Sequence, residues 1–157
     1  MTNEAIVSYQ SACDCDRALK QYQDHIAESN DAVVARKLFD AIQARDWVAA
    51  EVLFLPDAVM TWWTTSERFE GAKAIIHVNA VYPEGWSITV EHINPLADGR
   101  VHSVIQVDQS PRSFYANSIF RFCDGRIAQL DEWWATVEEP PVWRSDGQLP
   151  GYRRLGR

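Results

Sequence analysis

The stretch FRFCDGRIAQLDEWWAT, from Phe120 to Thr136, decides the fold. The residues on either side of Asp124-Gly125 are mostly aromatic or apolar, which favours two β-strands. An Asp-Gly pair between two strands is the strongest short signal for a two-residue hairpin, because both residues accept a positive φ. We therefore predict an antiparallel hairpin whose strands span residues 113–123 and 126–136.

The same turn predicts which side chains share a face of the sheet. If Cys123 lies opposite Arg126, then Asn117 lies opposite Glu132, and Tyr115 lies opposite Trp134. A turn at Ser110-Pro111 would extend these rows to the preceding strand. One face then carries Gln106, Tyr115 and Trp134 in one row, Val104, Asn117 and Glu132 in the next, and His102 one step further. A slip of one residue would move each shifted side chain to the other face.

The remaining segments predict helices first and strands afterwards. An amphipathic helix is expected in AVVARKLFDAIQARD after a cap at Asn30 or Asp31, because Val34, Leu38 and Ile42 recur every four residues. Further expected elements are a short helix at 47–54, a strand at 58–63, a polar turn at 64–71, a helix at 72–82, and strands at 86–93 and 100–108. This order predicts an α+β fold with helices on one face of a curved antiparallel sheet.

Charge and composition exclude several functions. The 157 residues carry a formal net charge of -7 and no cluster of Lys or Arg, so binding to nucleic acid or to anionic membranes is not expected. No apolar run approaches the roughly 20 residues that span a bilayer. The start MTNEAIVSYQ lacks the features of a signal peptide, so a cytoplasmic location is predicted.

The cysteines do not predict a disulfide framework or a metal site. There are three of them, and Cys13 and Cys15 have no second pair at ligand spacing, so reduced thiols are expected. The seven tryptophans point instead to buried or cavity-lining indoles. An apolar wall with a few polar groups is typical of a small-molecule pocket.

Four stretches together resemble the NTF2-like superfamily, and within it the SnoaL-like group related to ketosteroid isomerases. They are DWVAAEVLFLPDAVMTWW, RFEGAKAI, FRFCDGRIAQLDEWWA and EEPPVWR. The resemblance covers about residues 30–144 and implies a cone-shaped fold. We expect a domain at 29–144, an N-terminal and partly helical extension at 1–28, and a tail at 145–157.

The resemblance also implies which face of the sheet lines the cone. Asn117 falls at the position of an acid that hydrogen-bonds an oxyanion in the isomerases, and Trp134 matches a pocket tryptophan. The face with Asn117 and Glu132 should therefore point inward. The opposite face, with Trp133, Phe120 and Phe122, would pair two copies in a homodimer.

Two departures argue against a standard ketosteroid isomerase. The resemblance places the general base near Trp62 and the oxyanion tyrosine near Leu38, and neither residue can do that chemistry. The hypothesis is a small hydrophobic, carbonyl-bearing ligand and cofactor-free isomerisation, cyclisation or dehydration. Glu132 would be the acid or base, Asn117 and His102 would orient the substrate, and the pocket walls would be Trp62, Val104, Gln106, Tyr115 and Trp134. The alternative is a ligand-binding or protein-interaction module without chemistry. For Asn117 itself, the alternative to orienting a substrate is that it only hydrogen-bonds Glu132.

Overall fold

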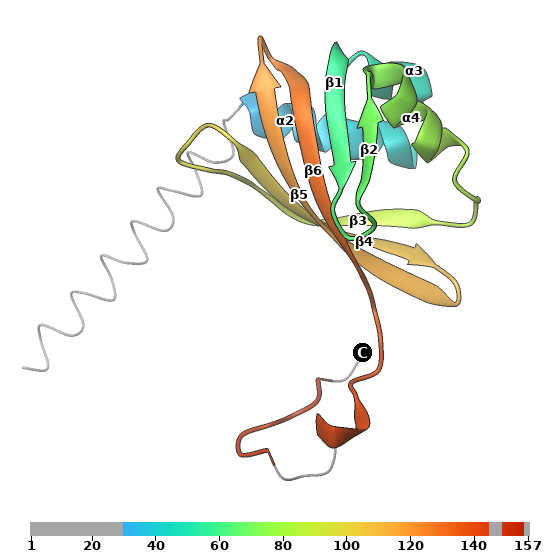
Figure 1. Ribbon diagram of the computed structural model, residues 1–157, viewed down its shortest axis with the longest axis vertical. Coiled ribbons are helices and arrows are strands. Elements are labelled where there is room, and N and C mark those ends of the chain that lie inside the picture. Colours follow the sequence, from blue (N-terminus) through green and yellow to red (C-terminus); the bar gives the residue numbers. More distant parts are fainter. Residues whose placement is uncertain (1–29, 145–148, 156–157) are drawn as a thin grey trace, which may run out of the picture.

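The computed structural model describes residues 30–144 and 149–155, so the predicted extension at 1–28 lies outside the described residues. In the described part, three α-helices pack on one face of a curved six-stranded sheet with the strand order β2-β1-β6-β5-β4-β3 (Figure 1). This confirms the predicted α+β fold. None of these helices is long and apolar enough to cross a membrane.

The helices bury the side chains that the sequence periodicity marks. Helix α2 (Asn30–Gln43) buries Ala35, Leu38, Phe39 and Ile42, which lie on one side of a 3.6-residue repeat. Helix α3 (Trp47–Glu51) is capped at its N-terminus by Asp46, whose carboxylate accepts a hydrogen bond from the Ala49 amide at 3.0 Å. Helix α4 (Ala72–Ala80) follows Gly71, whose φ of 88° favours glycine.

The sheet is mixed rather than wholly antiparallel. Strands β3 (Ser87–Pro95), β4 (Val101–Gln109), β5 (Arg112–Cys123) and β6 (Arg126–Thr136) form the predicted meander. Strand β1 (Phe54–Trp62) runs parallel to β6. The segment predicted to be only a turn contains a short strand, β2 (Glu67–Glu70), which pairs with β1.

The hairpin of β5 and β6 has the predicted turn but a different register beyond it. Cys123 faces Arg126 and Phe122 faces Ile127 as predicted, but Arg121 then faces Gln129. Ala128 is the extra residue of a bulge on β6. From the bulge onward, the predicted pairs are wrong by one residue, and Ser118 rather than Asn117 lies opposite Glu132.

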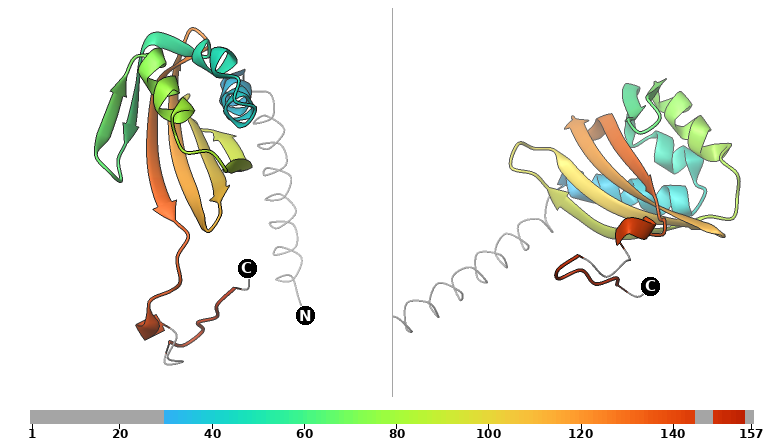
Figure 2. Two further views of the ribbon diagram at one scale, coloured as in Figure 1. Left: turned by 90° about the vertical axis from the view of Figure 1, so that its right-hand side faces the viewer. Right: turned by 60° about the horizontal axis from the view of Figure 1, so that its bottom comes forward.

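The core lies between the helices and the concave face of the sheet (Figure 2). Phe120 is fully buried there and meets Phe39 edge to face, with the ring centroids 5.9 Å apart. The prediction that Phe120 and Phe122 lie on the outer face is therefore wrong, because both side chains pack with the core. After β6 the chain leaves the sheet, and a short 3₁₀ helix, η1 (Val142–Arg144), lies apart from the body (Figure 2).

Candidate functional site

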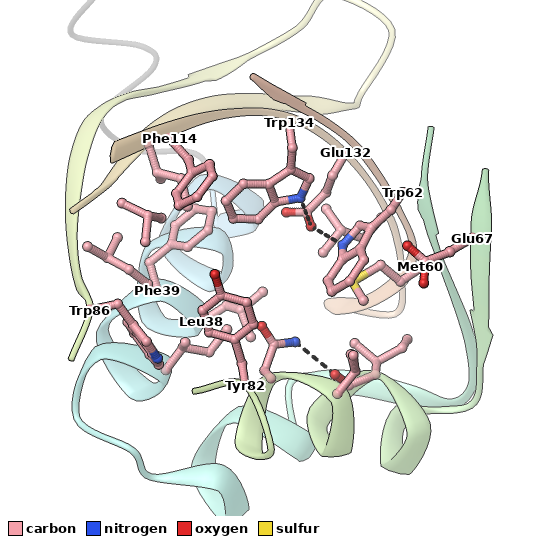
Figure 3. Close-up of a pocket in the computed structure, with 18 of the residues that line it drawn as sticks. Leu38, Phe39, Met60, Trp62, Glu67, Tyr82, Trp86, Phe114, Glu132 and Trp134 are labelled. Atoms are coloured by element: carbon pink, nitrogen blue, oxygen red, sulfur yellow. Dashed lines mark hydrogen bonds between the residues drawn. The ribbon is translucent and has the colours of Figure 1, made fainter. Parts of the chain in front are cut away.

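A cavity of about 350 Å³ lies between the helices and the sheet (Figure 3). This volume is within the range of small-molecule sites. Helix α2 contributes Leu38, Phe39 and Ile42 to the wall, and helix α4 contributes Ile75 and Asn79 among others. The strands contribute apolar and aromatic side chains, so the wall is largely apolar.

Glu132 is the buried acid in this wall. Its carboxylate accepts three hydrogen bonds from described residues. The indole nitrogens of Trp62 and Trp134 both donate to Oε2, at 2.7 Å and 3.3 Å, and the Ser118 hydroxyl donates to Oε1 at 3.0 Å. Figure 3 shows the two indoles pointing at the same carboxylate from either side.

The strand pairing places these groups together. Trp62 on β1 lies opposite Glu132 on β6, and Ser118 on β5 lies opposite Glu132 from the other side. Trp134 follows Glu132 by two residues and therefore points to the same face. The site thus depends on the parallel β1–β6 pair and on the bulge that brings Ser118 into line.

Burial raises the pKa of the Glu132 carboxyl, because the surrounding protein solvates the charged form poorly. The hydrogen bonds from Trp62, Ser118 and Trp134 oppose this effect by stabilising the carboxylate. Desolvation is the larger influence, so the pKa stays above the ordinary glutamate value. A carboxyl of this kind can exchange a proton with a bound molecule nearer to neutral pH than an exposed one.

Three of the predicted site residues, Glu132, Trp62 and Trp134, line the cavity. The prediction that five others lie with them is wrong: Asn117, His102, Val104, Gln106 and Tyr115 lie on the opposite face of the sheet. The predicted β4–β5 pairs are present, including Gln106 opposite Tyr115. The bulge moves this whole set to the outside relative to Glu132.

On the outer face these polar residues contact one another. The Tyr115 hydroxyl donates to Gln106 Oε1 at 3.1 Å, and His102 Nε2 lies 3.4 Å from Asn117 Oδ1. Asn117 therefore neither hydrogen-bonds Glu132 nor faces the cavity. The other role considered for Asn117, a hydrogen bond to Glu132, is also wrong, because Ser118 takes that place.

Sequence reasoning missed several cavity residues. Ser118 was missed because nothing in the sequence marks the bulge. Phe39 and Asn79 lie on helices, and a helical repeat indicates which side faces inward without indicating where the core leaves a space. Tyr82 and Trp86 lie in the connection between α4 and β3, where no periodicity places a side chain.

The outer face has its own group of tryptophans around an acid. Trp63 and Trp133 stack with an interplanar angle of 13° and are 52% and 45% exposed. Beneath them Asp131 accepts hydrogen bonds from the Trp63 indole at 2.9 Å and from the Gln129 amide at 2.7 Å. The predicted outward direction of Trp133 and Asp131 is thus present, although Asp131 is buried.

The described residues contain no cluster of side chains that could hold a metal ion. Within residues 30–144 and 149–155, no three His, Cys, Asp or Glu side chains come close enough to share a metal ion.

Comparisons with known proteins place this fold in a family. The family model of the SnoaL-like domain matches residues 35–130, which is more than half of the chain, so the chain belongs to the SnoaL-like domain family. This confirms the NTF2-like, SnoaL-like resemblance. No curated protein sequence matches the chain.

Solved structures support the fold. A proposed ketosteroid isomerase from Kribbella flavida DSM 17836 is 21% identical with a TM-score of 0.71, covering 85% of this chain and 95% of that one. An NTF2-like protein of unknown function from Burkholderia xenovorans LB400 is 19% identical with a TM-score of 0.67, covering 82% and 98%. A proposed SnoaL-like polyketide cyclase from Shewanella putrefaciens CN-32 is 14% identical with a TM-score of 0.58, covering 68% and 90%. At these identities the likeness shows the fold alone.

Proposed function

We propose that the protein binds a small, largely apolar molecule in the cavity and that Glu132 exchanges a proton with it. The reaction class is a cofactor-free isomerisation, cyclisation or dehydration. One observation carries the proposal: a single buried carboxyl with a raised pKa lies in an otherwise apolar wall. Fold alone does not determine a reaction, so the proposal rests on this site.

The hydrogen bonds indicate which oxygen of Glu132 would act. Oε2 already accepts from two indoles, whereas Oε1 accepts from Ser118. A carboxylate oxygen has two lone pairs, so Oε1 keeps one free position for a proton. The Ser118 hydroxyl can donate to the ionised form and can rotate to accept from the protonated form.

The two residues that differ from the isomerase pattern, Leu38 and Trp62, have other structural roles in this protein. Leu38, near the expected oxyanion tyrosine, is fully buried in the wall. Trp62, at the expected base position, donates to Glu132. Glu132 would therefore take the place of the missing base from the neighbouring strand. A carbonyl ligand, as the resemblance implied, would accept a hydrogen bond from protonated Glu132.

The elimination of 5-nitrobenzisoxazole tests Glu132 as a base without knowledge of the natural substrate. The base removes the ring C–H proton, the C–H electron pair completes a nitrile, and the N–O bond breaks to release a coloured phenolate. Native protein should accelerate this step over buffer, with a rate that rises as Glu132 ionises. In Glu132→Gln the acceleration should fall by about 100-fold or more.

Glu67→Gln is the matched control, because Glu67 is an exposed carboxylate at the same cavity. It should retain most of the native rate. Equal rates in native protein and Glu132→Gln would show that Glu132 is not an accessible base.

The alternative is a binding module without chemistry, and the replacement of the isomerase base and tyrosine by Trp62 and Leu38 favours it. Such a module would bind small apolar molecules but would leave 5-nitrobenzisoxazole at its background rate.

A homodimer is proposed on the outer face of the sheet. Trp63, Trp133 and Tyr115 expose large aromatic surface there, and clustered exposed aromatic side chains mark interaction sites. This surface keeps Trp133 from the predicted pairing face and has Trp63 and Tyr115 in place of Phe120 and Phe122.

A further inference from the structure

Most hydrogen-bond donors of the cavity wall are already used within the protein. The indole nitrogens of Trp62 and Trp134 donate to Glu132. The Asn79 amide nitrogen donates to the Ile75 carbonyl at 2.8 Å, and the Thr64 hydroxyl donates to the Trp134 carbonyl at 3.0 Å. A ligand that enters the cavity therefore meets few free donors.

The donors at the rim follow the same pattern. The Tyr82 hydroxyl donates to Gln109 Oε1 at 2.9 Å, and the Thr65 hydroxyl donates to Glu67. The Trp86 indole nitrogen has no hydrogen-bond partner and is buried at the cavity wall. Among the described lining side chains, the Thr136 hydroxyl at the exposed end of β6 and the second N–H of the Asn79 amide are left as free donors.

The acceptors, in contrast, remain open. Glu132 Oε1 has a free position beside the Ser118 bond, and Asn79 donates one N–H to Ile75 and leaves Oδ1 free. Glu67 adds a second carboxylate at the mouth. Figure 3 shows Glu132 and Glu67 on the same side of the cavity, on either side of Trp62.

The charged groups of the wall are of one sign. The lining contains two carboxylates, Glu67 and Glu132, and no Lys, Arg or His. The other titratable lining group is the Tyr82 phenol, and helices α2 and α4 contribute no titratable side chain to the lining. A buried carboxylate without a cationic partner is costly, and an incoming cation would supply that partner.

The aromatic side chains favour a cation as well. Trp62, Trp134, Phe39, Phe114 and Tyr82 surround the space next to Glu132 (Figure 3). Aromatic faces attract a positive charge, most strongly where water is excluded.

We propose that the cavity binds a hydrophobic amine as its ammonium form, with the nitrogen donating to Glu132 Oε1 and the apolar body filling the aromatic space. The proposal rests on the proposed use of the cavity as a small-molecule site, and it names the polar group of the ligand. An ammonium group has three donors and no acceptor, which matches a wall of open acceptors. A ligand carbonyl would need a donor, which Glu132 supplies when it is protonated, and a ligand carboxylate would be repelled.

Four probes that share one apolar body test this. They are 4-phenylbutylamine, 4-phenyl-1-butanol, 4-phenyl-2-butanone and 4-phenylbutyrate, titrated into the full-length protein by calorimetry at about pH 8, where an alkylamine keeps its proton. The amine should bind about tenfold more tightly than the alcohol or the ketone, as a charge-assisted hydrogen bond implies. The carboxylate should bind most weakly.

The pH dependence of the native protein's affinities distinguishes the amine from the ketone, and this test needs no variant. Amine affinity should rise as pH increases and Glu132 ionises, whereas ketone affinity should fall because protonated Glu132 is the donor. Glu132→Gln should reduce the preference for the amine over the alcohol to about twofold or less, because the charge is gone. Glu67→Gln should reduce that preference by a smaller factor than Glu132→Gln, because Glu67 is an exposed carboxylate.

The outcomes distinguish this inference from the proposed function. A ketone or alcohol that binds as tightly as the amine overturns the amine inference, while catalysed elimination of 5-nitrobenzisoxazole would still support Glu132 as a base. Failure of all four probes to bind folded protein, together with background elimination, overturns both proposals.

Discussion

At the scale of single residues, two neighbouring acids occupy matching sites on opposite faces of one strand. Glu132 points inward and accepts from Trp62 and Trp134, and Asp131 points outward and accepts from Trp63. The alternation of a strand makes this possible, because the consecutive residues Asp131 and Glu132 of β6 point to opposite faces, as do Trp62 at the end of β1 and Trp63 after it. The inner acid faces a cavity, so its protonation can respond to a ligand.

The buried Glu132 should make stability depend on pH. Because its pKa is raised in the folded state, the folded protein holds a proton that the unfolded chain releases. The free energy of unfolding should therefore fall as pH rises from the ordinary glutamate pKa of about 4.3 through the raised value, by about 1.4 kcal/mol for each unit of the shift.

The Glu132→Gln variant cannot lose stability in this way. Its melting temperature minus that of the native protein should therefore increase as pH rises. Thermal unfolding from about pH 4.5 to 8.5 measures the difference. Glu67→Gln, which removes an exposed carboxylate, should show a much smaller trend. A difference between native protein and Glu132→Gln that is constant with pH would contradict the burial effect.

The indole donors should hold the pKa of Glu132 below what burial alone would give. Trp62→Phe removes the bond at 2.7 Å and should raise this pKa more than Trp134→Phe, which removes the one at 3.3 Å. Titration of ¹³C-labelled glutamate carboxyls by NMR measures it, with Glu132→Gln to assign the resonance. Trp63→Phe on the outer face is the control, and a Glu132 pKa that is unchanged in all three variants would refute the role of the donors.

At the scale of elements, the sequence predicted segments well and their register less well. The ends of β6 match the predicted 126–136, and Asp124-Gly125 forms the turn with φ values of 51° and 71°. The bulge at Ala128 could not be predicted, because it reflects how β6 pairs with β1 and β5 together rather than any local residue preference. That single extra residue decided which polar side chains face the cavity.

The start of α4 depends on a glycine that should not tolerate a side chain. Gly71 has φ 88° and ψ 144°, which is nearly exclusive to glycine, and an added Cβ would lie 3.3 Å from the Pro56 carbonyl oxygen. We expect Gly71→Ala to lower the free energy of unfolding by about 2 kcal/mol. Urea denaturation measures the loss.

Gly85→Ala is the matched control for Gly71→Ala. Gly85 also has a positive φ, of 101°, but an added Cβ would meet no atom within 4 Å. Both variants should lose stability through backbone strain, and Gly71→Ala should lose more because of the contact with Pro56. Equal losses would show that the contact adds nothing.

At the scale of the whole molecule, helices before a meander sufficed to predict the layers. Between them the structure has a cavity, and five of the residues that the sequence assigned to it lie elsewhere. The sequence did not predict the shape of that cavity. Its wall combines α2, α4 and most of the strands, so it depends on how closely the helices approach the curved sheet. The outer face was misassigned in part, because the bulge puts Phe120 on the inner face while Trp133 stays on the outer one.

The outer face gives the last prediction, that two copies pair through the Trp63–Trp133 stack. Trp133→Lys replaces an exposed aromatic ring with a flexible cation that lies near Asp131, so the fold should tolerate it while the apolar contact is lost. Light scattering after size-exclusion chromatography should give the mass of two chains for the native protein and of one chain for Trp133→Lys. Trp143→Lys, which changes an exposed tryptophan on η1 away from the sheet, should stay a dimer. A native protein with the mass of one chain, or a Trp133→Lys variant that remains paired, would mean that the stacked indoles are not the contact between copies.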